Sequence, residues 1–279
     1  MQPGGFSPGP AVRVQTADGR RVFVKAVGPE LNPDSPGIFR QEARIVAGLP
    51  ATAPVPRLLW VYDEGEDGWI MLVFEDVEGW NPAQPWRPDD LDRVLDALRS
   101  LSASLTPSPI DAAPASDMFA SIICGWQLLR EEPSGQLDEW SARHLPDLAA
   151  LEAMAVEAVR GDTLLHFDIR ADNLLLTPTR VFVVDWPSAC IGAAWVDLVL
   201  FAPSVAMQGG PQPEELLRRH PAAENADPDR VTAAVAALAG YLTQRALLPL
   251  PPGLPTLRAF QAAQGVVTRR WLARRTGWT

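Results

Sequence analysis

A short polar loop near the middle of the chain, closed in by apolar segments on both sides, constrains the fold more than any other feature. The apolar runs at 163–167, 174–176 and 181–184 are too short for helices and favour buried strands. A loop between two buried strands presents its polar side chains together at one rim. These side chains are His166, Asp168, Arg170 and Asn173.

A carboxylate closes the next strand. The segment at 181–184 ends at Asp185, 17 residues after Asp168. We expect these two carboxylates and the amide of Asn173 to converge. Mg²⁺ in proteins prefers carboxylates, water and substrate phosphates as ligands, so this convergence is a candidate magnesium site.

The N-terminal part is interpreted as a small β-rich lobe. Alternating apolar residues at 11–15 and 21–27 predict two strands. The turn signal Asp18-Gly19 between them predicts a β-hairpin that carries Lys25 in its second strand. Two more strands are predicted at 57–62 and 69–74.

A helix is expected between these two pairs of strands. Ser35 is its candidate N-cap, and Pro36 is expected in its first turn. Gly48 or Pro50 is expected to end it. The residues of its predicted apolar face are Ile38, Ile45 and Leu49.

The rest of the chain is mainly helical. Residues 76–88 contain three prolines and are interpreted as a linker. We therefore predict an α+β fold of two lobes, a small β-rich lobe at 1–75 and a larger, mainly helical lobe at 76–279. The helical patterns lie at 89–105, 116–132, 143–160, 194–207, 212–219, 228–246 and 254–276.

The polar loop contains the motif His166-x-Asp168-x-x-x-x-Asn173. Followed by Asp185 at the end of a strand, this motif resembles that of the aminoglycoside phosphotransferase and choline kinase family, which is similar in fold to the protein kinases. The resemblance extends over roughly the whole chain. It implies a bilobal, protein-kinase-like fold.

The resemblance also implies a role for each residue. Asp168 would orient and deprotonate the acceptor hydroxyl, and Asn173 and Asp185 would hold Mg²⁺ on the phosphates of ATP. Lys25 would contact the α- and β-phosphates, and Glu42 on the predicted helix would hold Lys25 in place. Lys25 is the only lysine among 24 basic residues, which is typical of a position that needs an ammonium group.

Three further residues come with the same resemblance. Arg170, two residues after Asp168, either stabilises charge on the γ-phosphate or forms an ion pair with Asp172, and both alternatives stay open. His166 is expected to support the catalytic loop by packing and hydrogen bonding. Asp197 is expected to anchor that loop from the next helix.

The resemblance places the nucleotide between the lobes. Gly4, Gly5 and Ser7 look like the family's nucleotide-covering loop, whose backbone N–H groups and hydroxyl face phosphates. The base would lie against the backbone from Phe74 to Val77. In the family a strand precedes this loop, yet three residues precede Gly4, so either the sequence starts late or the lobe lacks its first strand.

Composition disfavours several other classes of protein. The net charge of −10 argues against nucleic acid as the main partner, because phosphate neutralisation needs a basic surface. No apolar run is long enough for a membrane span, and the first residues lack the pattern of a secretory signal. Two cysteines exclude a disulfide scaffold, and a cytoplasmic location is expected.

We therefore expect an ATP- and Mg²⁺-dependent kinase that phosphorylates a hydroxyl of an aminoglycoside, an amino alcohol or a sugar. Most of the net negative charge lies after Glu75, where a solvated surface or a cationic acceptor explains it. The alternative function is a pseudokinase that binds nucleotide without transfer, and the intact set of site residues speaks against it. Protein phosphorylation is disfavoured because Asp185 and Asp197 are only 12 residues apart, which leaves no room for an activation segment.

Overall fold

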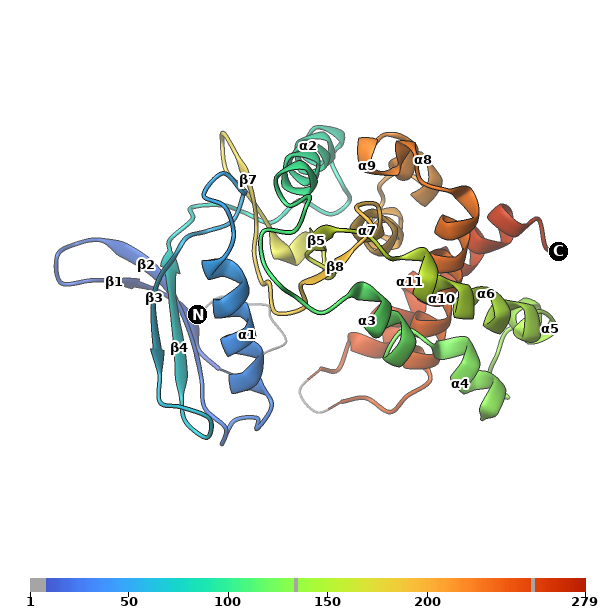
Figure 1. Ribbon diagram of the computed structural model, residues 1–279, viewed down its shortest axis with the longest axis horizontal. Coiled ribbons are helices and arrows are strands. Elements are labelled where there is room, and N and C mark those ends of the chain that lie inside the picture. Colours follow the sequence, from blue (N-terminus) through green and yellow to red (C-terminus); the bar gives the residue numbers. More distant parts are fainter. Residues whose placement is uncertain (1–8, 133–134, 252–253) are drawn as a thin grey trace.

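The computed structural model describes residues 9–132, 135–251 and 254–279 of the 279-residue chain. Two lobes lie side by side along the long axis of the molecule (Figure 1). The small lobe consists of an antiparallel sheet and one helix, and the large lobe is mainly helical. The predicted α+β class is therefore confirmed.

The sheet of the small lobe has the strand order β1-β2-β4-β3, and each neighbouring pair is antiparallel. Its hairpin strands have the predicted bounds, and the other two are shifted by one residue. Lys25 lies opposite Ala11 on one side and Leu72 on the other, so it occupies the interior of the sheet. The strands are β1 Ala11–Gln15, β2 Arg21–Val27, β3 Leu58–Asp63 and β4 Ile70–Glu75.

Helix α1 (Ser35–Ala47) packs against this sheet on the side of the large lobe (Figure 1). The prediction of Ser35 as its N-cap is wrong, because Ser35 is already helical and Asp34 precedes it. The Oδ1 of Asn32 instead accepts the N–H groups of Asp34 at 2.9 Å and Ser35 at 3.2 Å. Gly48 follows the helix, as predicted.

The buried face of α1 differs from the predicted one by a single position. Ile38 is 43% exposed, and its neighbour Phe39 is buried instead. Ile45 and Leu49 pack in the core as predicted. Since positions three apart share a helix face, the exchange of Ile38 for Phe39 puts Glu42 on the buried face, with 2% of its surface exposed.

The large lobe is built around helix α10, which packs against α4, α6, α7 and α11. Its buried run of alanines at 233–239 is interrupted by Val235 and Leu238 and lets the neighbouring helices approach closely. No helix in the described part of the chain is long and apolar enough to cross a membrane. The helices of this lobe are α2 Pro88–Ser104, α3 Ala115–Ser121, α4 Gly125–Glu131, α5 Glu139–Arg143, α6 Leu145–Ala158, α7 Val196–Met207, α8 Pro213–Arg218, α9 Pro221–Glu224, α10 Pro228–Ala246 and α11 Leu257–Thr276.

One predicted helix is broken in the structure. The helix predicted at 116–132 divides into α3 and α4, whereas the helix predicted at 143–160 corresponds to α6, and the short α5 before it was not predicted. The break brings the start of α4 against α10. A Cβ atom at Gly125 would lie 2.1 Å from the carbonyl oxygen of Gly240, so this approach requires glycine.

Glu152 on α6 accepts hydrogen bonds from the first backbone N–H groups of α4. Its carboxylate is 2% exposed and accepts the N–H groups of Trp126 at 3.0 Å and Gln127 at 2.8 Å. Burial raises the pKa of Glu152 to about 7, and these hydrogen bonds limit the rise. A buried acid thus takes the place of a local N-cap.

Four short strands form the centre of the molecule. Strand β5 (Thr163–Leu165) pairs with β8 (Cys190–Gly192), and β6 (Leu174–Leu176) pairs with β7 (Val181–Val183), both antiparallel. Strand β8 was not predicted. A single 3₁₀ turn at Ala171–Asn173 leads into β6. The two pairs hold the polar loop and Asp185 on the side of the small lobe.

The proline-rich segment predicted as a linker is fixed to these strands. Trp80 donates a backbone hydrogen bond to Leu176 at 2.9 Å and accepts one from it at 2.8 Å. The Asn81 Nδ2 donates to the carbonyl of Leu174 at 2.9 Å and to that of Asp172 at 3.1 Å. The connection between the lobes therefore forms a defined wall of the space between them.

Candidate active site

His166 holds the polar loop from within. It is completely buried, its Nε2–H donates to the carbonyl of Val184 at 2.9 Å, and its Nδ1 accepts the N–H of Asp168 at 3.2 Å. Burial lowers the pKa of His166 to about 4, so the ring is neutral at physiological pH. The ring also meets Trp186 edge to face at 4.7 Å. The expected scaffold role of His166 agrees with these contacts.

Asp197, at the start of α7, anchors the same loop by hydrogen bonds to its backbone. Its carboxylate accepts the N–H groups of His166 at 2.9 Å and Phe167 at 2.8 Å. Phe167 has a φ of 67°, a left-handed conformation that a phenylalanine adopts only when its surroundings enforce it. Burial raises the pKa of Asp197 to about 6, and the two N–H donors oppose that rise.

Asp168 and Asn173 are joined directly. The Asn173 Nδ2 donates to the backbone carbonyl of Asp168 at 2.8 Å and to its Oδ2 at 3.2 Å. The Oδ1 of Asn173 is thereby left to face a ligand. Partial burial, with the nearby charges of Asp172 and Asp185, raises the pKa of Asp168 to about 6. A carboxylate with this pKa is ionised at pH 7 and is a competent proton acceptor.

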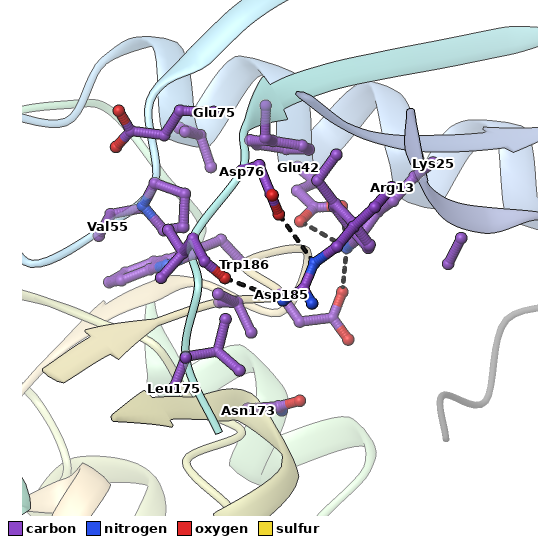
Figure 2. Close-up of a pocket in the computed structure, with 18 of the residues that line it drawn as sticks. Arg13, Lys25, Glu42, Val55, Glu75, Asp76, Asn173, Leu175, Asp185 and Trp186 are labelled. Carbon is purple, nitrogen blue, oxygen red and sulfur yellow. Dashed lines mark hydrogen bonds and ion pairs between the residues drawn. The ribbon is translucent and has the colours of Figure 1, made fainter. Parts of the chain in front are cut away.

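Lys25, Glu42 and Asp185 meet although they come from β2, α1 and the segment after β7 (Figure 2). The Lys25 Nζ lies 2.8 Å from Glu42 Oε1, 3.0 Å from Glu42 Oε2 and 2.6 Å from Asp185 Oδ1. Burial disfavours the ammonium, but the two carboxylates outweigh it and raise the pKa of Lys25 above its usual value. The same ammonium holds the pKa of Asp185 below its usual value against the effect of burial.

A cavity of about 430 Å³ lies between the lobes and contains most of the predicted site. Lys25 and Glu42 line it from the small lobe, and Asn173 and Asp185 line it from the large lobe (Figure 2). Phe74 and Val77, predicted near the base of the nucleotide, also line it. Asp168 does not line this cavity, but its Oδ2 accepts a hydrogen bond from Asn173, which does. Gly4, Gly5 and Ser7 lie outside the described residues.

Arg170 forms the ion pair that was one of its two alternatives. Its Nε lies 3.0 Å from Asp172 Oδ1, and its Nη2 pairs with the other oxygen of Asp172. Its Nη1 lies 3.7 Å from Asp168 Oδ1. The guanidinium therefore bridges two carboxylates beside the proposed proton acceptor, and the ion pair leaves the γ-phosphate role open.

The oxygen atoms of Asn173 and Asp185 at the cavity fit a magnesium ion whose remaining ligands are phosphates and water. In the described part of the chain, no three His, Cys, Asp or Glu residues come together as a metal site. Asn173 Oδ1 and the Asp185 carboxylate are hard oxygen donors that line one cavity. Mg²⁺ typically takes one or two protein carboxylates and completes its shell with water and substrate phosphates. This pair of residues matches that pattern.

The sequence did not reveal several residues that line the cavity. Arg13 and Asp76 form an ion pair at its end near the connection between the lobes, with 2.8 Å between Arg13 Nε and Asp76 Oδ1. Trp186 closes its inner wall and donates its indole N–H to Val183. The one available signal was the alternation of β1, which puts Arg13 on the same face as Ala11, opposite Lys25.

The comparison with protein families settles the class. A model described as the phosphotransferase enzyme family matches residues 3–234. The chain belongs to this family. The resemblance inferred from the motif is thereby confirmed, and the chain is a phosphotransferase.

Solved structures of the same fold are similar to this phosphotransferase over nearly its whole length. A thermostable mutant of an aminoglycoside phosphotransferase, in ternary complex with AMP-PNP and hygromycin B, has a TM-score of 0.66 at 16% identity and covers 100% of this chain and 94% of that chain. The choline kinase LicA from Streptococcus pneumoniae has a TM-score of 0.62 at 15% identity and covers 98% of this chain and 92% of that chain. Spectinomycin phosphotransferase in complex with ADP and spectinomycin has a TM-score of 0.57 at 12% identity and covers 100% of this chain and 92% of that chain.

The curated proteins yield no match to this chain. At identities of 12 to 16% the structural likeness establishes the fold, and it confirms the predicted protein-kinase-like arrangement of two lobes.

Proposed function

We propose that this phosphotransferase transfers the γ-phosphate of ATP, with Mg²⁺, to a hydroxyl group of a small cationic molecule. The observation that carries the proposal is the meeting of Lys25, Glu42 and Asp185 at 2.6–3.0 Å in a cavity that Asn173 also lines. A pseudokinase has no need of this complete set. Phosphoryl transfer depends mainly on positioning and on neutralising charge, which these residues are suited to provide.

Each residue takes one part of the reaction. Asp168 orients the acceptor hydroxyl and takes its proton as the oxygen attacks the γ-phosphorus and the bond to the β-phosphate oxygen breaks. Lys25, held by Glu42, contacts the α- and β-phosphates. Asn173 and Asp185 hold the magnesium ion, which when bound neutralises developing negative charge on the phosphates. Arg170 steadies the Asp168 carboxylate.

The acceptor is proposed to carry a positive charge. Asp172 and Asp185 both raise the pKa of Asp168, and the guanidinium of Arg170 opposes them. Three carboxylates therefore lie near one arginine on the acceptor side of the cleft. Net negative charge of −10 on the whole chain acts in the same direction at longer range. Amino alcohols and aminoglycosides combine a hydroxyl with ammonium groups and fit this environment. The same net charge supports a function without nucleic acid.

A cytoplasmic location is part of the proposal. Cys124 and Cys190 are both free thiols in the structure, as the reducing cytosol would keep them.

ADP release in the presence of a panel of acceptors tests the proposal. We expect turnover with one or more amino alcohols or aminoglycosides, loss of turnover when EDTA removes Mg²⁺, and recovery when Mg²⁺ is restored. Neutral sugars of similar size serve as matched acceptors without positive charge. Tight nucleotide binding with no turnover on any acceptor would contradict the enzyme and support the pseudokinase, and turnover on neutral sugars alone would contradict the cationic acceptor.

A further inference from the structure

The end of the cavity near the connection between the lobes carries an arginine whose purpose the proposed reaction does not explain. Arg13 lies on β1, and its guanidinium projects into the cavity (Figure 2). Its Nε lies 2.8 Å from Asp76 Oδ1, and its Nη2 donates to the carbonyl of Val77 at 2.9 Å. Both partners belong to the segment that leaves β4 for the large lobe. Arg13 thus fastens the β1–β2 hairpin to that segment.

The anchor of this arginine is a buried carboxylate. The Asp76 side chain is 3% exposed, and its second oxygen lies 3.0 Å from the Nη2 of Arg21 on β2. Two arginines from neighbouring strands therefore share one carboxylate. Burying a charge without partners is expensive, so Asp76 fixes the position of Arg13 strongly.

The register of the sheet separates Arg13 from the phosphate end of the cavity. Arg13 is opposite Phe23, whereas Lys25 is opposite Ala11, two residues further along the hairpin. Two residues of a strand span roughly 7 Å. Arg13 contacts Asp76 and Val77, which places its guanidinium at the end of the cavity proposed for the base.

The guanidinium keeps one nitrogen without a hydrogen bond to the described residues. This nitrogen is Nη1, and 41% of the Arg13 side chain is exposed. Apolar side chains of Phe23, Leu175 and Val184 line the same cavity. A flat, weakly hydrated cation next to apolar walls is suited to stacking on an aromatic ring.

We infer that Arg13 is a nucleotide-binding residue that covers the purine base of the bound nucleotide and holds the hairpin closed over it. The inference rests on the proposed function only in taking a purine nucleotide as the ligand of this cavity. It assigns base binding to a side chain on β1, in addition to the backbone from Phe74 to Val77. Arg13 takes no part in phosphoryl transfer.

The test is binding of adenosine, ADP and AMP-PNP, measured by calorimetry with Mg²⁺ and no acceptor. For Arg13→Ala we expect each of the three ligands to bind about tenfold more weakly, because a stacked cation contributes this much and the phosphates are not involved. Arg13→Lys keeps the charge but lacks the planar fork, and we expect it to weaken adenosine binding too. If turnover is found, kcat at saturating nucleotide should change less than twofold while KM for ATP rises.

Arg20→Ala is the matched control, since Arg20 lies in the turn of the same hairpin, is 82% exposed and pairs with Asp18. It should leave all three affinities unchanged. Unchanged adenosine affinity in folded Arg13→Ala or Arg13→Lys would overturn the inference and leave a purely structural clip. A loss confined to ADP and AMP-PNP would overturn it by placing Arg13 at the phosphates. A wild type that binds nucleotide without turnover would contradict the proposed function alone, and one that binds none would contradict both.

Discussion

At the scale of single residues, two left-handed positions mark the cleft. Phe167 has a φ of 67° and Asp185 a φ of 72°. Such backbone conformations cost roughly 1–3 kcal/mol in residues other than glycine and persist where the surroundings enforce them. Phe167 is held by Asp197, and Asp185 is held by Lys25. Phe167 directly precedes Asp168, and Asp185 carries a carboxylate of its own. Both left-handed residues therefore set the position of a carboxylate at the site.

The pKa of Asp168 predicts a pH dependence of the reaction. Its value of about 6 belongs to the free enzyme, and the ionised form is the one that takes the proton. The active fraction is therefore full above about pH 7 and falls roughly tenfold for each pH unit below 6. The measurement is kcat/KM for the acceptor between pH 4.5 and 8. A profile without a descending acid limb near pH 6 would contradict this role.

The pair of Lys25 and Glu42 predicts a coupling in stability. Lys25→Met leaves the buried Glu42 carboxylate without its partner, and we expect the free energy of unfolding to fall by about 3 kcal/mol. The double variant Lys25→Met, Glu42→Gln removes the charge as well and should recover part of the loss. Urea unfolding of the wild type, of Lys25→Met, of Glu42→Gln and of the double variant measures this coupling. Strictly additive effects of the two substitutions would refute it.

Residues close in sequence were predicted better than residues that meet across the fold. Asp168 and Asn173 belong to one loop, so their spacing alone indicates their association. Lys25 and Glu42 needed the family resemblance. Arg13 was missed because its contact with Asp76 depends on how the hairpin packs on the connection between the lobes, which no local pattern contains.

At the scale of elements, the start of α7 supports the catalytic loop. Asp197→Asn keeps one acceptor oxygen for two N–H donors, those of His166 and Phe167. We expect a loss of stability of about 1–3 kcal/mol and, through displacement of Asp168, a fall in kcat on the order of a hundredfold. Thermal unfolding and kcat measure the two effects. Asp147→Asn on the exposed side of α6 is the control, and kcat equal in both variants would argue against an anchoring role.

Glu152 predicts a pH-dependent stability that its amide variant lacks. Its pKa is about 7 in the folded protein and near 4.3 in the unfolded chain, so the folded state binds more protons between these values. The contribution of Glu152 is therefore present at low pH and lost as pH rises through 7. Relative to Glu152→Gln, the wild type should lose about 3 kcal/mol between pH 4.5 and 8.

Urea unfolding of both proteins at several pH values measures this difference. The amide variant serves as the reference for the wild type. The histidines with lowered pKa titrate in both proteins, so their effect cancels in the difference. A difference that stays constant with pH would contradict a raised pKa of Glu152 in the folded protein.

Element existence was predictable from periodicity, and element breaks were not. Helix α10 has its predicted bounds because its pattern is long and unbroken. The break between α3 and α4 arises from the close approach of Gly125 to Gly240, a tertiary contact between distant segments. Strand β8 has the sequence Cys-Ile-Gly, whose glycine breaks the kind of apolar run that indicated the equally short β6 and β7.

At the scale of the whole molecule, the arrangement of the lobes converts dispersed residues into one site. The small lobe contributes Lys25, Glu42 and Arg13 to the cavity, and the central strands contribute Asn173 and Asp185. The bilobal fold was predictable through the motif, because the motif implies a family of known shape. The acceptor was not predictable, because the motif specifies residues for phosphoryl transfer and none for the rest of the acceptor.

The central claim is tested most directly by following the phosphorus atom. ³¹P NMR of wild type with ATP, Mg²⁺ and an amino alcohol or aminoglycoside should show ADP and a phosphate monoester of the acceptor in equal amounts. In Asp168→Asn the monoester should form at least about a hundredfold more slowly, while Asp147→Asn should behave as wild type. Inorganic phosphate in place of the monoester, or equal monoester formation in Asp168→Asn, would contradict the account.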